Sequence, residues 1–180
     1  SENGEMGKAL SILKNEMVGS YCFTFISDDN SVYAARDPKG FRPMILGHKE
    51  SDDTYIVTSE SAAVTAVAAK LQRDVVPGEL IKLSKNGLET EKFSDDKSRA
   101  HCSFEFTYFA HPSSMMEGHN IYVSRKNIGR FMAKKFPIKD ADLVIPVPDS
   151  ARPAALGYAQ ELGVSFDEGL LKDRYSKKGP

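Results

Sequence analysis

The sequence has few cysteines, no long apolar run and almost no net charge, and each of these absences excludes a class of protein. Two cysteines far apart, Cys22 and Cys102, cannot form a disulfide framework and suit a reducing compartment. No apolar run approaches the ~20 residues of a membrane span, and the polar N-terminus does not resemble a signal peptide. The formal charge of −1 gives no general attraction to nucleic acid or membranes. We therefore expect a cytoplasmic protein.

The 180 residues are 41% hydrophobic and 27% charged, enough to bury the core of one large or two partial domains. Apolar periodicity predicts alternating helices and strands, and residues 92–100 are polar and read as a surface loop. The lysine, asparagine and glycine at 85–87 predict a hairpin turn. Helices are expected over 4–17, 60–71, 123–136 and 153–162, and strands over 21–26, 32–35, 54–58, 79–83, 88–91, 102–110, 143–145, 164–166 and 169–171.

The stretch LVIPVPDSARPAALGY, residues 143–158, is the most informative. An apolar run ends at two prolines, and a second apolar pattern follows a polar turn. Asp149 or Ser150 is a suitable N-cap, and Pro153 fits a first helical turn. The unit is thus strand, turn and helix. A helix N-terminus beyond the carboxyl end of a parallel strand favours a phosphate, but an ordinary connecting loop fits the local pattern equally well.

Four blocks of sequence carry a resemblance to a known family. They read RDPKGFRP from Arg36, CSFEFTYFA from Cys102, the stretch from Leu143, and EGLLKDRY from Glu168. In this order, and over almost the whole chain, they resemble amidophosphoribosyltransferase, the glutamine phosphoribosylpyrophosphate amidotransferase that opens purine biosynthesis. Departures occur at His111 and Ser113, where the family commonly has Arg and Asp.

The resemblance implies a mixed α+β and α/β fold. Residues 1–112 are similar to the C-terminal part of a glutaminase domain of the N-terminal-nucleophile type, an αββα sandwich. Residues 113–140 would form a junction and linking helix. Residues 141–180 resemble the start of a type I, Rossmann-like phosphoribosyltransferase domain. The family's N-terminal cysteine nucleophile and its ribose-phosphate-binding motif have no counterpart in this sequence, so we expect no catalytic residue within it and an inactive isolated chain.

The resemblance also implies substrate-binding residues, which are Asp149, Ser150, Lys172, Arg174 and Tyr175. Ser150 matches a residue at the magnesium–pyrophosphate site, and oxygen ligands suit Mg²⁺. The segment from Lys172 matches the beginning of a loop that closes over the substrate, although a charged terminus is ordinarily a solvated tail.

Two other positions favour structural roles. Cys102 matches the first ligand of a [4Fe-4S] cluster that some members carry, but such a cluster needs four thiolates, and packing of a small buried side chain is the favoured interpretation. Arg36, Asp37 and Arg42 surround a tight turn, where we favour an ion pair that holds the turn over contact with a ligand.

The implied parent protein is a glycosyltransferase that converts glutamine, phosphoribosylpyrophosphate and water to 5-phosphoribosylamine, glutamate and pyrophosphate, with Mg²⁺. The expected partners are these substrates, and either copies of the same chain or the missing segments, because partial domains expose apolar surface. A non-catalytic subunit that binds a phosphoribosyl group, and completes or regulates a separate chain, is the alternative.

Overall fold

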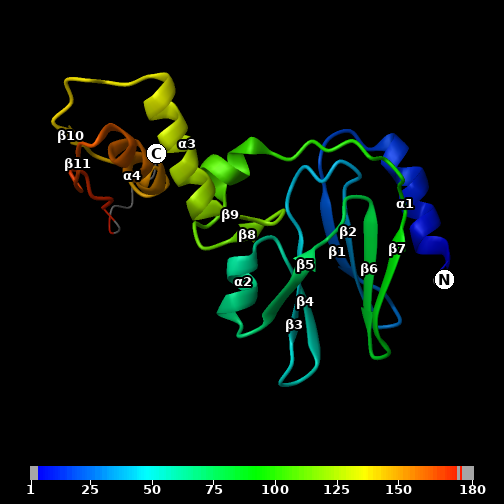
Figure 1. Cartoon of the computed structure of the whole chain (residues 1–180). Coiled ribbons are helices and arrows are strands. Elements are labelled where there is room, and N and C mark those ends of the chain that lie inside the picture. Colours follow the sequence, from blue (N-terminus) through cyan, green and yellow to red (C-terminus); the bar gives the residue numbers. More distant parts are fainter. Residues whose placement is uncertain (1–3, 174, 176–180) are drawn as a thin grey trace. The chain divides into compact units, whose positions relative to one another are not determined.

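The computed structural model describes residues 4–173 and 175 and divides the chain into two compact units, Ser1–Ser103 and Phe104–Pro180 (Figure 1). The division precedes the junction that the sequence predicted over 113–140. The helix expected in that junction therefore belongs to the second unit.

The first unit contains a four-stranded antiparallel sheet with one face covered by helix α1 (Gly4–Glu16). Alternate side chains of the central strands point to opposite faces, as the two-residue period of a strand requires. Tyr33 and Leu80 pack with Leu10 of α1, whereas Ala34 and Ile81 face the other way. The strands, in spatial order, are β1 (Cys22–Ile26), β2 (Val32–Arg36), β6 (Glu79–Ser84) and β7 (Gly87–Lys92).

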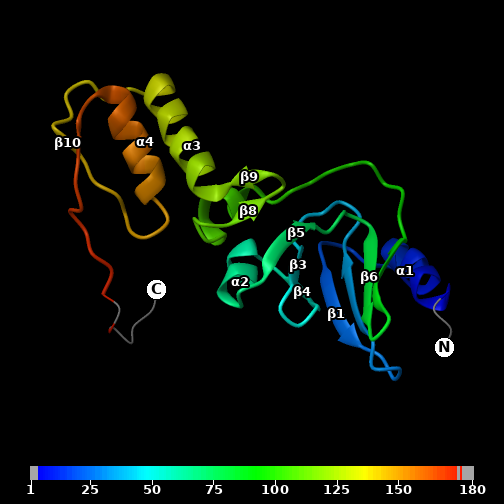
Figure 2. The same cartoon turned by 60° about the horizontal axis from the view of Figure 1, so that its bottom comes forward.

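A three-stranded antiparallel sheet packs against the second face of the first sheet. It has the order β4 (Thr54–Thr58), β3 (Ile45–Lys49), β5 (Lys70–Asp74). Met44, Leu46 and Val75 from this side join Ala34 and Ile81 in one buried cluster. Helix α2 (Ser61–Ala66) covers the outer face, where Val64 packs on Gly47. The layers run helix, sheet, sheet, helix, which is the αββα order expected from the sequence (Figures 1 and 2).

Helix α2 is shorter than the sequence predicted. The expected helix over 60–71 ends at Ala66, and Ala68 takes a left-handed conformation with φ of 57°. Residues 70–74 form β5, whose main chain pairs with β3. The sequence analysis predicted neither strand. Pairing with β3 outweighs the helical spacing of the apolar residues, and Leu71 stays 43% exposed. The hairpin turn is confirmed, with Ser84 paired to Gly87 and a φ of 103° at Gly87.

The second unit is built on two helices in close contact, α3 (Ile121–Lys135) and α4 (Arg152–Leu162). Glycines allow their backbones to meet. A Cβ atom on Gly129 would lie 1.8 Å from the Ala154 carbonyl oxygen, and one on Gly157 would lie 2.0 Å from the Lys126 carbonyl oxygen. Any larger residue at either glycine would force the helices apart. A parallel pair of short strands, β10 (Leu143–Val144) and β11 (Ser165–Phe166), brackets α4 along the chain.

The strand predicted over 102–110 is wrong, because residues 105–109 form a π-helical turn, η1 (Glu105–Phe109). Carbonyl groups of this turn accept hydrogen bonds from the buried Arg125, which reaches the Phe106 oxygen at 2.7 Å and the Ala110 oxygen at 2.8 Å. A small core of Ala110, Met116 and Ile121 lies beside it, next to the short pair β8 (Met115–Met116) and β9 (His119–Asn120).

The strand predicted over 169–171 is also wrong, since these residues have no regular structure. Across residues 4–173 and 175, no helix combines the length and apolar character that a membrane crossing requires.

Candidate functional site

The loop between β10 and α4 is the strand–turn–helix unit predicted from the sequence. Pro146 is buried in it, and the peptide bond between Pro148 and Asp149 is cis. Helix α4 begins at Arg152 with Pro153 in its first turn, as expected. The N-cap prediction is wrong: Ala151 occupies that position and no side chain caps the helix.

Asp149 is engaged by an arginine and does not cap the helix. Its Oδ1 atom lies 3.0 Å from a terminal nitrogen of Arg152, and its side chain is half exposed. Ser150 is half-buried on the same turn. Both therefore lie between the carboxyl end of a parallel strand and a helix N-terminus, a position where main-chain N–H groups favour anions.

The segment after β11 carries the other predicted binding residues. Lys172 is exposed, and so is Tyr175, whose main-chain N–H donates to Oδ1 of Asp173 at 2.9 Å. The prediction for Arg174 lies outside the described residues. Within residues 4–173 and 175, no hydrogen bond or ion pair joins Lys172 or Tyr175 to the Asp149–Ser150 turn. The assignment of these residues to one site stays a prediction.

The side chains near α4 and the two cysteines differ in how well they suit a metal. A carboxylate at 149 and a hydroxyl at 150 are the hard oxygen donors that Mg²⁺ uses together with water and phosphate. Cys102 is buried, and its main-chain N–H donates to the Phe41 carbonyl at 3.0 Å. Cys22 is exposed, with its thiol directed at the Pro43 carbonyl, 3.6 Å away. The described part of the chain holds no cluster of three or more metal-binding side chains, and two cysteines do not fit a four-thiolate cluster.

The turn after β2 is held by hydrogen bonds to the main chain. Arg36 is 1% exposed and donates to three carbonyl oxygens, those of Arg42 at 2.9 Å, Val75 at 2.7 Å and Gly40 at 3.1 Å. Asp37 accepts from the N–H groups of Lys39 and Phe41, both at 3.0 Å. These hydrogen bonds hold the turn, and the ion pair that the sequence favoured stays a prediction.

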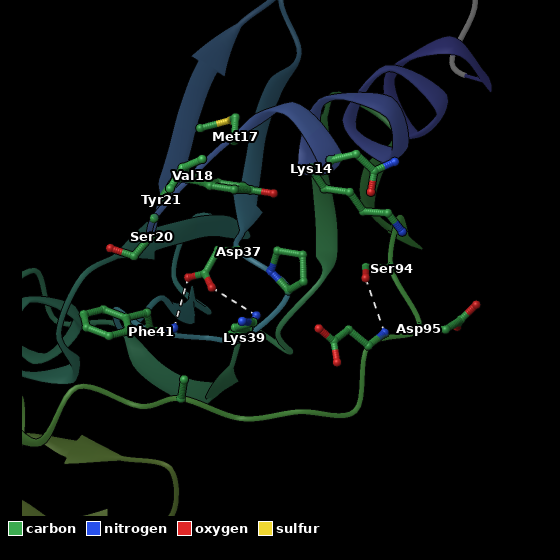
Figure 3. A pocket seen from close by; sticks show the side chains of 15 residues that line it. Lys14, Met17, Val18, Ser20, Tyr21, Asp37, Lys39, Phe41, Ser94 and Asp95 are labelled. Atoms are coloured by element: carbon green, nitrogen blue, oxygen red, sulfur yellow. Dashed lines mark hydrogen bonds between the residues drawn. The ribbon is translucent and has the colours of Figure 1, made fainter.

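A hollow of about 1010 Å³ lies beside that turn in the first unit (Figure 3). Its walls come from the end of α1, the residues before β1, the turn after β2 and the loop after β7. The sequence analysis missed it because these four segments are far apart along the chain. The side chains that shape it include Lys14, Tyr21, Asp37, Lys39, Phe41 and Asp96.

Two groups in the hollow have shifted pKa values. Burial raises the pKa of the Tyr21 phenol, and the nearby Asp37 carboxylate adds to the rise. Hydrogen bonds from Ser98 lower the pKa of Asp96. At neutral pH the hollow therefore presents a neutral Tyr21 phenol and an ionised Asp96 carboxylate, beside two lysines. This mixture of charges does not by itself select a ligand.

Comparison with known proteins gives a consistent result. No protein-family model matches the chain. It is 42% identical over 174 residues to the amidophosphoribosyltransferase of Archaeoglobus fulgidus, covering 97% of this chain and 37% of the relative. The amidophosphoribosyltransferases of Mycobacterium tuberculosis and Bacillus subtilis are 43% and 37% identical over 157 and 171 residues.

Solved structures agree. A structure described as the allosteric regulatory enzyme of purine biosynthesis superimposes with a TM-score of 0.89 at 35% identity, covering 97% of this chain and 36% of that one. The glutamine phosphoribosylpyrophosphate amidotransferase of B. subtilis, complexed with ADP and GMP, gives a TM-score of 0.84 at 34% identity, covering 97% and 40%. The chain thus spans between 29% and 40% of the length of these relatives.

Proposed function

This chain is homologous to a portion of amidophosphoribosyltransferase, and on that premise we propose that its parent protein transfers the amide nitrogen of glutamine to phosphoribosylpyrophosphate. Similarity along 97% of the chain, in sequence and in fold, carries the proposal. The reaction balances in two steps. Glutamine and water give glutamate and ammonia, and ammonia then displaces pyrophosphate from the anomeric carbon to give 5-phosphoribosylamine.

The two units would serve different steps. The αββα layers of the first unit would form part of the glutaminase, and the β10–α4 turn would begin the phosphoribosyl site. In this proposal Asp149 and Ser150 bind the pyrophosphate end of the substrate, with Lys172, Arg174 and Tyr175 approaching it. Mg²⁺, held by the Ser150 hydroxyl with Asp149 nearby, would neutralise charge on the departing pyrophosphate. The cysteines argue against a cluster held by this chain alone.

The isolated chain would perform neither step, because we assign no nucleophile to its described residues. Association with itself or with further segments is part of the proposal, since large apolar side chains such as Phe131, Phe136 and Val147 are 64%, 69% and 67% exposed. So is a cytoplasmic location, which the widely separated cysteines favour.

A chimera tests the proposal directly. The matching third of the B. subtilis amidophosphoribosyltransferase is replaced by this chain, and the purified chimera is assayed for glutaminase and for pyrophosphate release that depends on phosphoribosylpyrophosphate. We expect both activities, and loss of the second alone in a Ser150→Ala chimera. A folded chimera with glutaminase but no transferase activity would contradict the assignment of the β10–α4 turn.

The size of the native protein provides a second test. Intact mass of the protein from its source, measured under denaturing conditions, should exceed the 19.9 kDa of this chain. A native 19.9 kDa chain without a partner would instead favour a non-catalytic binding module.

A further inference from the structure

Arg152 joins two segments that the family resemblance assigns to the same substrate. Its terminal nitrogen lies 3.0 Å from Oδ1 of Asp149, before α4, and its Nε lies 2.9 and 3.2 Å from the two carboxylate oxygens of Glu168, after β11. One guanidinium therefore links residues 19 positions apart in the sequence. The planar fork of arginine suits this role, because different nitrogens can serve different carboxylates.

The segment after β11 has few other attachments. The Asp167 N–H donates to the Val144 carbonyl at 3.2 Å, which is the last main-chain bond to β10. Among the described residues, no bond between main-chain groups holds 168–172. The Glu168 N–H donates only to the adjacent Asp167 side chain, at 2.8 Å. The contact with Arg152 is thus the main polar restraint on this segment.

Gly169 supplies an apolar contact next to the ion pair. A Cβ atom at this position would lie 2.9 Å from two carbon atoms of Ile145, so the chain crosses the β10–α4 loop at a distance that favours glycine. Apolar contact at Gly169 and ion pairing at Glu168 act on neighbouring residues. Together they would set the direction in which the chain continues toward Lys172.

We propose that Arg152 is a positioning residue, which holds the Asp149–Ser150 turn and the Glu168–Lys172 segment beside each other for a phosphoribosyl substrate. The substrate part of this inference rests on the proposed function. Arg152 also offsets part of the negative charge of Asp149 and Glu168, which would repel a polyphosphate at this end of α4. Its role would be to set the geometry and charge around the binding residues, without taking part in bond chemistry.

Hydrogen exchange of the complete 180-residue chain tests the structural part. Arg152→Gln removes the charge and keeps most of the side chain. We expect exchange of the peptide over residues 164–168, which contains the hydrogen-bonded N–H groups of Asp167 and Glu168, to rise about fivefold, a size typical of losing exposed ion pairs. In 1 M salt the native chain should approach the variant, because screening weakens exposed pairs. Exchange in the variant should change little with salt.

A matched control is available on α4. Lys134 of α3 lies 3.5 Å from Glu161 of α4, an exposed pair that does not include the segment after β11. Lys134→Gln should leave exchange over 164–168 unchanged. Equal exchange in native protein, Arg152→Gln and Lys134→Gln would overturn the proposal. If Arg152→Gln disturbs α4 itself, Glu168→Gln removes the same ion pair from the other partner. Exchange in the double variant should be no faster than in either single variant, because both substitutions remove one interaction.

The chimera separates this inference from the proposed function. In an active chimera, Arg152→Gln should raise the KM for phosphoribosylpyrophosphate about fivefold with kcat within twofold, and should leave glutaminase unchanged. Arg152→Lys should recover part of the loss, because it retains the charge without the fork. An inactive parent chimera would count against the function, whereas an active one insensitive to Arg152→Gln would count against positioning.

Discussion

The first unit buries its core between two sheets, whereas the second relies on contact between two helices. In the first unit Ala34 and Ile81 are fully buried between the two sheets, and α1 and α2 close the outer faces. In the second, α4 packs on the β10–β11 pair, yet Leu143 of β10 and the adjoining Ile145 stay 49% and 45% exposed. Parallel strands are ordinarily covered on both faces. The comparison teaches that the first unit approaches a complete layered core and the second does not.

Each unit nevertheless contains a buried arginine whose side chain binds main-chain carbonyl groups. Replacing either arginine should give the largest difference in stability between the two units. Arg36→Met leaves three carbonyls without their donor and should destabilise the first unit by about 4 kcal/mol. Arg125→Met leaves two carbonyl groups without their donor and should lower the unfolding free energy of the second unit by about 3 kcal/mol. Hydrogen exchange under increasing urea, followed by peptides from each unit, measures both. Equal loss in both units from either substitution would show that they unfold together.

The helix contact offers a sharper test of the second unit. Gly129→Ala places a methyl group against the Ala154 carbonyl, and a backbone atom cannot move aside easily. We expect a loss of about 2 kcal/mol in the second unit, even though alanine favours a helix. Gly7→Ala on α1 is the matched control, because its methyl group would meet only the movable end of the Glu91 side chain. By urea denaturation, Gly7→Ala should be neutral or slightly stabilising. A loss comparable to that of Gly129→Ala would contradict the claim that contact with a backbone atom causes the destabilisation.

Acid should weaken the first unit through its surface carboxylates. Hydrogen bonds from Ser27 and Ser31 lower the pKa of Asp29, and hydrogen bonds from Lys70 and Lys49 lower those of Glu50 and Asp52. Folded-state pKa values below the unfolded ones add stability that is present above about pH 4 and is lost as the pH falls through the folded values. The urea midpoint of this unit should therefore be steady from pH 7 to 5 and decline toward pH 2. Asp29→Asn should flatten that decline, and a midpoint independent of pH would contradict the assignment.

The smallest effect is expected from a tyrosine of the second unit. The Tyr158 hydroxyl donates to the Phe136 carbonyl at 2.7 Å and accepts from the Ile138 N–H at 3.2 Å, which ties the connection after α3 to α4. Tyr158→Phe should cost about 1 kcal/mol. Tyr122→Phe, on the same unit, is the control and should cost little, because the Tyr122 hydroxyl makes no hydrogen bond with the residues that the structure describes. Thermal denaturation of the two variants gives the difference, and equal melting temperatures would deny the hydroxyl a structural role.

The sequence predicted correctly those elements that are determined by neighbouring residues, such as turn residues and apolar spacing. The hairpin around Gly87 follows from its turn residues, and α4 follows from Pro153 and its apolar spacing. The prediction of a strand over 102–110 was wrong because its aromatic residues favour strands. In the structure the Phe106 carbonyl accepts a hydrogen bond from Arg125, farther along the chain, and residues 105–109 form a π-helical turn. Strand β5 was hidden for a similar reason, because its partner β3 lies about 25 residues earlier.

The candidate site was predictable in part. The strand–turn–helix pattern placed Asp149 and Ser150 correctly in the turn before α4, although neither caps the helix. Nothing local indicated that Asp149 would pair with Arg152, because arginine at the third position after an aspartate is common on any surface. The link to Glu168 depends on how β11 returns beside β10, which only the fold reveals.

The buried guanidinium of Arg36 also has a consequence for the order of events in folding. Its acceptors include the nearby Gly40 carbonyl and the Val75 carbonyl, 39 residues away. The full set of bonds forms only after β2 and the residues following β5 have come together, so closure around Arg36 is expected late. Arg36→Met should then accelerate unfolding and leave the refolding rate nearly unchanged. Stopped-flow chevron plots would show this as a shift of the unfolding arm alone, and slower refolding would place Arg36 in the nucleus.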